Sequence, residues 1–361
     1  MKILFLGDFC PTKYNFDLFR AGDTEALFGN ALPFLKEKRD RTVVNLECAI
    51  TEEGSPIRKF GPNLKAPLQT AGVLAEIGAS CCAISNNHVL DFGSEGVKNT
   101  VSALNSVGIA VTGYGKNAED SRRDLVFEDG NSKIAVIAVC EHEYSYALED
   151  REGCRPFDEF DTLEDIRSAK KTADRVIVCY HGGKEYCRYP SPRLLKACRA
   201  MVKSGADLVL CQHSHCIGCC ENYMGGHILY GQGNFHFVGK SEFEGWHSSL
   251  AVDYDTETNS VKFTPMVSGE RGISLADEKT AEKLLAEFEM RNSALASGRW
   301  VLGWEEFCES VRDRYTSAVA NAFTPQSSEN DDAFFGHYLD CEAHTDVWRQ
   351  LFKTWHHENN I

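Results

Sequence analysis

The chain has 361 residues, of which 43% are hydrophobic and 25% are charged, a balance typical of a soluble globular protein. Its formal net charge of −15 disfavours binding to a nucleic-acid backbone, so we expect no nucleic-acid partner. The same charge does not exclude an anionic substrate, because bound cations can invert the local field.

The first residues, MKILFLGDF, have too short an apolar core for a signal peptide and read well as a first strand. No apolar run in the sequence reaches the length of a membrane span. Fifteen cysteines without a secretion signal favour reduced thiols. We therefore expect a cytoplasmic protein without a membrane span.

Short apolar runs alternate with amphipathic stretches as far as about residue 267. Runs rich in Ile, Val and Leu indicate strands buried on both faces. The predicted strands are 2–7, 42–47, 79–85, 109–114, 133–139, 175–181, 207–213 and 227–233, followed by an antiparallel pair at 249–254 and 260–267. The predicted helices between them include 68–78, 94–107 and 191–205, and residues 142–165 read as an acidic surface loop. This alternation predicts an α/β fold.

The pattern changes at about residue 270, where strand signals stop. Helical spacing appears at 276–297, 304–322 and 344–357, and residues 321–332 read as a flexible loop. We therefore predict a domain of residues 1–269 followed by a helical C-terminal extension of residues 270–361.

Five of the predicted strands end in side chains that can bind metals or protons. Because ligands of α/β sheets bind beyond the carboxyl ends of the strands, we expect these side chains to form one cluster. Carboxylate, amide and imidazole groups suit Zn, Mn or Fe. The two histidines of His-Ser-His can face the same side of an extended segment. The strand-end residues are Asp8, Glu47, Asn86-Asn87-His88, His181, and His213 with His215.

The order of these motifs resembles the CapA family, also called the poly-gamma-glutamate or capsule synthesis family. The matching segments are GD, NLE, GPNLKAP, NNHVLDFG, GIAVTGYGKN, HGGKEY, GADLVLCQHSH and YGQGNF, and they cover about residues 1–240. That family belongs to the calcineurin-like metallophosphoesterase superfamily. The resemblance therefore implies a four-layer αββα sandwich that holds one or two divalent metal ions (Mn, Zn or Fe).

The resemblance also implies roles for the matching positions. Asp8 and His215 would bind one metal, Glu47 would bridge, and the second metal would be bound by Asn87, His181 and His213. His88 would act as general acid or stabilise the transition state. Residues that would support the ligands or contact the substrate are Asn86, Asp91, Glu185 and Asn234. Superfamily members carry Asp-x-His at the first motif, whereas this chain has Asp8-Phe9-Cys10, so either the Cys10 thiolate fills the position or Cys10 is a buried structural residue.

The implied activity is a metal-dependent hydrolase that activates water against a phosphoester or gamma-glutamyl bond. Its substrate would be an anionic polymer or a small phosphoester or gamma-glutamyl compound. The alternative is a non-catalytic component of capsule or poly-gamma-glutamate synthesis or export, which keeps the fold for binding and assembles with the capsule machinery.

Several local alternatives also stay open. Cys216 and Cys219 form C-x-x-C beside the two histidines, which allows a structural zinc site, although a second ligand pair at finger-like spacing is missing. Asp91 either orients His88 or lies in the first turn of a helix, and Glu185 either fixes a ligand imidazole or forms a surface salt bridge. Side chains that either meet an anionic substrate or are simply solvated are Arg58, Lys184 and Arg188.

Overall fold

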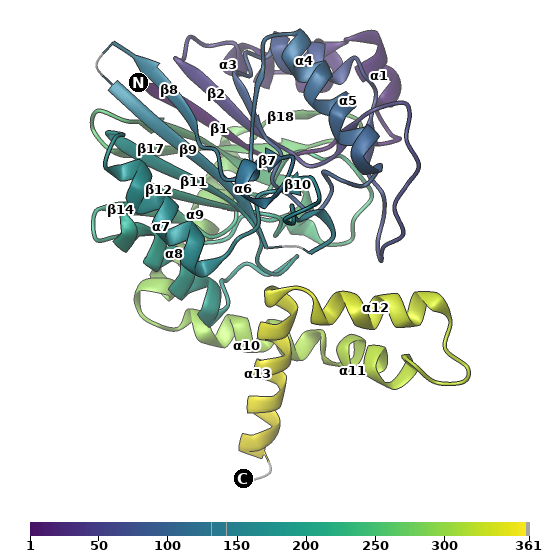
Figure 1. The fold of residues 1–361 in the computed structure, drawn as a ribbon. Coiled ribbons are helices and arrows are strands. Elements are labelled where there is room, and N and C mark those ends of the chain that lie inside the picture. Colours follow the sequence, from purple (N-terminus) through teal and green to yellow (C-terminus); the bar gives the residue numbers. More distant parts are fainter. Residues whose placement is uncertain (131, 142, 359–361) are drawn as a thin grey trace.

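The computed structural model describes residues 1–130, 132–141 and 143–358, and two facing sheets form the centre of the fold (Figure 1). The first sheet has the order β18 (Ile273–Leu275), β17 (Ser260–Ser268), β16 (Ser248–Asp255), β1 (Lys2–Phe9), β2 (Arg41–Leu46), β5 (Cys81–Ala83) and β6 (Ala110–Thr112), and β15 (Asn234–His236) pairs with β1 beside this path. The second has the order β13 (Cys220–Tyr223), β14 (Gly226–Leu229), β12 (Leu208–Gln212), β11 (Arg175–His181), β9 (Ser132–Cys140) and β8 (Leu125–Asp129).

Each sheet has a block of four parallel strands, and antiparallel strands complete one edge of the first sheet and both edges of the second. β1, β2, β5 and β6 run parallel, as do β9, β11, β12 and β14. Two short pairs lie outside these sheets, β3 (Ala49–Ile50) with β4 (Lys65–Ala66) and β7 (Tyr114–Gly115) with β10 (Gly153–Cys154). Parallel strands place their carboxyl ends at one edge, which is where the candidate site forms.

Helices cover the outer face of each sheet, which gives four layers (Figure 1). Those against the first sheet are α1 (Phe16–Ala21), α2 (Thr24–Phe28), α3 (Ala31–Leu35), α4 (Thr70–Glu76) and α5 (Gly93–Ser106), and α6 (Ala118–Ser121) lies beside β7 and β10. Those against the second sheet are α7 (Glu159–Lys170) and α8 (Pro192–Ser204). The chain starts α8 with Pro192 in its first turn and with the Ser191 hydroxyl accepting from the Leu194 amide at 3.0 Å.

Side-chain alternation along β1 explains the layering. Ile3 and Phe5 belong to the buried cluster between the two sheets, whereas Leu4 and Leu6 belong to the cluster under helices α1 to α5. Successive side chains of a strand point to opposite faces, so a strand that is apolar at every position must be covered on both. The four-layer αββα class predicted above is confirmed.

The C-terminal helices continue from the second sheet's side of the molecule. They are α9 (Glu278–Ala296), α10 (Trp300–Ser310), α11 (Arg312–Asn321), α12 (Glu329–Leu339) and α13 (Glu342–Glu358), and α13 projects away from the sheets (Figure 1). Trp300, Trp304 and Tyr315 share one buried cluster with Leu194 of α8. Within the described part of the chain, no helix combines the length and apolarity that a membrane crossing requires.

Most predicted elements are present, and the differences are local. The predicted helix 304–322 is divided at Val311 into α10 and α11, and the second part of the predicted loop 321–332 is the start of α12. The predicted loop 142–165 contains β10 and the start of α7, and its residue 142 lies outside the described residues. β18 adds a strand to the first sheet beyond residue 269, and the division into two domains at that point stays a prediction.

Candidate metal centre

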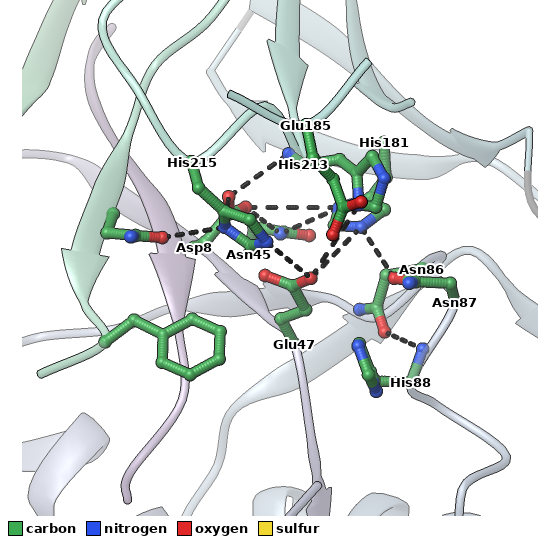
Figure 2. Close-up of polar contacts among 12 residues, drawn as sticks. Asp8, Asn45, Glu47, Asn86, Asn87, His88, His181, Glu185, His213 and His215 are labelled. Carbon is green, nitrogen blue, oxygen red and sulfur yellow. Dashed lines mark hydrogen bonds and ion pairs between the residues drawn. The ribbon is translucent and has the colours of Figure 1, made fainter. Parts of the chain in front are cut away.

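The strand-end residues lie together where the carboxyl ends of both sheets meet (Figure 2). From the first sheet, β1 carries Asp8 and β2 leads directly into Glu47. From the second sheet, β11 ends at His181, and His213 and His215 follow β12. The turn after β5 carries Asn86, Asn87 and His88, and Asn234 of β15 lies opposite Asp8 in the parallel pairing.

Glu47 occupies the centre of this group and is fully buried. Its Oε1 lies 3.4 Å from Nε2 of His181 and 4.0 Å from both Nδ1 of His213 and Nε2 of His215. Neither carboxylate oxygen accepts a hydrogen bond from the described residues. A buried carboxylate without hydrogen bonds is costly unless positive charge compensates it, so the arrangement is suited to a cation.

Asp8 is the second buried carboxylate, and its oxygens are held by hydrogen bonds. Oδ1 accepts from Nδ2 of Asn45 at 2.7 Å, and Oδ2 accepts from the His213 backbone N–H at 3.1 Å. Burial raises the pKa of Asp8, but the adjacent His215 and His181 and the Asn45 amide outweigh burial and lower it below its usual range. Asp8 is therefore ionised and can ligate a metal.

His215 lies between Asp8 and Glu47. Its Nδ1 is 3.4 Å from Oδ2 of Asp8 and 2.9 Å from Oδ1 of Asn234. Burial lowers the pKa of His215, but the carboxylates of Glu47, Asp8 and Glu185 raise it to about 9. In the absence of a metal this imidazole is thus a cation, and its single positive charge offsets part of the negative charge of the two buried carboxylates.

His213 and His215 reach the cluster through unusual backbone conformations. Their φ angles are 82° and 54°, in the left-handed region that non-glycine residues seldom adopt. The extended segment predicted for His-Ser-His is therefore wrong, because β12 ends at Gln212. The two imidazole rings still converge, with centroids 5.7 Å apart. Such strain concentrates at functional sites, where the surrounding structure holds it in place.

The three side chains of the Asn86-Asn87-His88 turn point to different places: one bonds the backbone, one joins the histidine cluster and one lines the cavity. Asn86 donates to the Leu46 carbonyl at 2.7 Å and accepts from the His88 amide at 3.1 Å, which fixes the turn. Oδ1 of Asn87 lies 3.0 Å from Nε2 of His181, so the amide joins the histidines. His88 is buried beside them and lines an adjacent cavity.

Asp91 orients His88, since its Oδ2 lies 2.6 Å from Nδ1 of that imidazole. α5 begins only at Gly93, so the alternative position of Asp91 in the first turn of a helix is not the observed one. Lys59, which the sequence analysis missed, is buried beside this pair, with its ammonium bonded to Asp91 and 3.1 Å from Nδ1 of His88. The position of Lys59 in an irregular loop gave no periodic signal from which to predict this role.

Glu185 and the three cationic residues named in the sequence analysis, Arg58, Lys184 and Arg188, differ in their surroundings. Glu185 faces the cluster in Figure 2, lines the cavity and forms an ion pair with Lys184 at 3.3 Å, and its role in fixing a ligand imidazole stays a prediction. Arg58 and Arg188 form ion pairs with Glu329 and Glu287. Asn45 was also missed as part of the site, although it lies in the quoted NLE motif.

The cysteines near the cluster are not arranged as ligands. Burial raises the pKa of the Cys10 thiol far above its usual value, and its Sγ contacts the Pro11 carbonyl at 3.3 Å. Burial also raises the pKa of the Cys216 thiol to about 11 and raises the pKa of the Cys219 thiol well above its usual value. The candidate ligand group found among the described residues consists of Glu47, His213 and His215 and includes no cysteine, which favours the interpretation of Cys10 as a structural residue over a ligand role for these thiols.

The fit to a divalent cation rests on the donor set. Among the described residues, ligand atoms of Glu47, His213 and His215 all lie within 4.8 Å of one another, and all three residues are buried. Asp8, Asn87 and His181 surround this group at the distances given above. Imidazole nitrogens with carboxylate oxygens are a donor set for Zn, Mn or Fe. The residues present therefore fit a metal of this class.

Comparison with known proteins shows which family shares these features. Residues 2–238 match the family described as "Bacterial capsule synthesis protein PGA_cap". The chain is 27% identical over 280 residues to "Capsule biosynthesis protein CapA" of Bacillus anthracis, covering 74% of this chain and 66% of the relative. It is 26% identical over 262 residues to "PGA biosynthesis protein CapA" of Bacillus subtilis (strain 168), covering 71% and 67%.

The match thus spans about two thirds of the length of these relatives. A solved structure of a hypothetical protein from Thermus thermophilus has a TM-score of 0.44 and 17% identity, and the match covers 76% of this chain and 98% of that one.

Proposed function

Because the chain belongs to the bacterial capsule synthesis (PGA_cap) family, which is related to the calcineurin-like metallophosphoesterases, we propose that it is a metal-dependent hydrolase of phosphoester or gamma-glutamyl bonds. The observation that carries this proposal is the buried Glu47 carboxylate, which faces three histidines without accepting a hydrogen bond from the described residues. When bound there, a divalent cation lowers the pKa of its water and polarises a phosphoryl or carbonyl oxygen.

The donors divide into two groups that share Glu47. Asp8 and His215 lie on one side, 3.4 Å apart. Asn87 and His181 lie on the other, 3.0 Å apart, with His213 4.0 Å from Glu47. This division supports one or two ions with Glu47 as the shared ligand, in the order that the superfamily resemblance implied.

His88 is the proposed general acid. Asp91 and Lys59 hold its Nδ1, so Nε2 is the nitrogen left to face the cavity. As water oxygen bonds to phosphorus or to the carbonyl carbon, the bond to the leaving oxygen or nitrogen breaks, and Nε2 gives that atom its proton. Loss of this group typically costs about 10²–10⁴-fold in rate.

Metal analysis tests the assignment of ligands. The purified protein, loaded with Mn²⁺ or Zn²⁺ and dialysed, should retain metal, and His213→Ala should weaken binding by more than about 100-fold. The matched control is the double variant Cys216→Ser/Cys219→Ser, which should bind metal normally. Loss of metal with the cysteines and retention with His213→Ala would instead establish the structural zinc site.

An activity screen tests the chemistry. Phosphomonoesters, phosphodiesters and gamma-glutamyl peptides with added Mn²⁺ should include a substrate, and His88→Asn should lower its kcat while leaving metal content unchanged. If the metal-loaded protein hydrolyses none of these three classes of compound, the result would contradict the hydrolase and favour a binding role in capsule or poly-gamma-glutamate synthesis.

A further inference from the structure

The cavity beside the candidate metal centre has one wall outside the part of the chain that the family match covers. Its volume is about 590 Å³, within the range of small-molecule sites. Asn87, His88 and His213 line it on the side of the sheets. α10, α11 and α12 line it on the other side, and the family match ends at residue 238. The side chains of the second wall include Phe307, Arg314, Tyr315 and Tyr338.

Three cationic side chains line this cavity, and two of them are already paired with carboxylates. Lys59 is bonded to Asp91, and Lys184 lies 3.3 Å from Glu185. For the third, Arg314, no ion pair with a carboxylate exists within residues 1–130, 132–141 and 143–358. The chain carries 53 acidic residues against 38 basic ones, so an arginine without an acidic partner beside the site is notable.

The Arg314 side chain lines the cavity and also lies against an aromatic ring of α12. Its central carbon lies 5.5 Å from the centroid of the Phe334 ring, at cation–π distance. Burial raises the pKa of Tyr186 and of Tyr338, and the nearby Arg314 opposes that rise in both. Tyr186 follows β11 whereas Tyr338 lies on α12, and both line the cavity together with Arg314.

The helices that carry Arg314 are fixed to the body of the molecule. The neighbouring Tyr315 is buried, stacks on Tyr338 with ring centroids 4.1 Å apart, and lies 2.6 Å from Nδ1 of His344 through its hydroxyl. Asp346 of α13 forms an ion pair with Arg193 of α8 at 3.0 Å. A charge carried on packed helices is held more accurately than one on a loop.

We propose that Arg314 is a specificity residue that selects substrates with a second anionic group, remote from the bond that is hydrolysed. This inference rests on the proposed function, in which the metal centre holds the reacting group at the opposite side of the cavity. A guanidinium offers two parallel N–H donors, which match either a carboxylate or a phosphate. The helical extension thereby determines which anionic compounds the shared centre accepts.

Matched probes test this inference by binding. One pair is phenyl phosphate and 4-carboxyphenyl phosphate, and the other is gamma-glutamyl-alanine and gamma-glutamyl-glutamate. In each pair only the second compound carries the additional carboxylate. Calorimetric titration is done with chelator-treated protein and again with Mn²⁺. Arg314→Gln should weaken the second member of at least one pair about tenfold, which corresponds to about 1.4 kcal/mol, and leave its partner within about twofold.

The matched control is Arg312→Gln, which removes the same charge from the same helix at a guanidinium bonded to Glu309 at 2.6 Å. This variant should leave the binding affinity of all four probes unchanged. The pair of probes whose binding responds to Arg314→Gln identifies the type of substrate. Equal weakening of both members, no weakening, or no preference of the unaltered protein for the additional carboxylate would overturn the inference.

The two proposals fail separately. If protein loaded with Mn²⁺ neither retains the metal nor hydrolyses any substrate, the hydrolase is contradicted. If Arg314→Gln still weakens binding of the compound with the additional carboxylate to chelator-treated protein, the anion subsite stands. Metal-dependent hydrolysis that is indifferent to Arg314 would contradict only the subsite.

Discussion

His213 and His215 illustrate how single residues are placed at a free-energy cost for function. A non-glycine residue at positive φ costs on the order of 1–3 kcal/mol, and here two such residues are separated by only Ser214. In the absence of a metal, part of this cost is offset because His215 places a positive charge between Asp8 and Glu47. Protonation and metal binding therefore compete for the same imidazole.

The pKa of His215 gives a prediction for the chelator-treated protein. Because folding raises this pKa from 6.5 to about 9, the resulting stability is fully present below pH 6.5 and is lost as the pH rises through 9. The loss amounts to about 3 kcal/mol. Urea unfolding of the wild type and His215→Asn should show a difference between them that shrinks from pH 6 to pH 9.5. A difference that is constant with pH would contradict the prediction.

At the scale of elements, the end of β1 depends on a close approach of two backbones. The strand pairing shifts register between Leu6 and Asp8, and the Asp8 amide donates to the Gly233 carbonyl at 3.3 Å. A Cβ on Gly7 would lie 2.2 Å from that carbonyl oxygen. Gly7 therefore allows β1 to bring Asp8 into the cluster.

Gly7→Ala should destabilise the protein by about 1–3 kcal/mol, the usual cost of overpacking, and should also weaken metal binding. The matched control is Gly72→Ala in α4, where an added Cβ meets nothing within 4 Å, so it should be neutral or stabilise by up to about 1 kcal/mol. Urea unfolding and metal titration measure both effects. Normal metal affinity in Gly7→Ala would show that Asp8 does not depend on this contact.

Sequence patterns predicted the buried strands well because both faces of each sheet are covered, as the apolar runs at 175–181 and 207–213 show. The strand-end rule also led to Asp8 and Glu47 without any structure. Lys59 and Arg314 were not predicted, because a loop residue and an exposed helix residue carry no periodic signal, and only the tertiary packing brings them to the cavity. The break at Val311 was missed because α10 and α11 together keep helical spacing across it.

At the scale of the whole molecule, a buried ion-pair network joins the C-terminal helices to the second sheet. Arg193 of α8 lies 3.0 Å from Asp346 of α13 and 2.9 Å from Glu141 at the end of β9. Burial raises the pKa of both carboxylates despite the opposing charge of Arg193. The network thus fixes the position of the helices more than it adds to stability, as is common for buried ion pairs.

Removing one partner of this network should have a much larger effect than removing an exposed pair. Asp346→Ala should cost about 3 kcal/mol, the lower end for a broken buried pair, since Glu141 still faces Arg193. Arg58→Gln is the matched control, because Arg58 also joins the extension to the body, through Glu329, but both side chains are largely exposed. It should cost less than about 1 kcal/mol. Urea unfolding followed by tryptophan fluorescence, with Trp300 and Trp304 in the buried interface, measures both. Equal losses would mean that apolar packing alone holds the cavity wall in place.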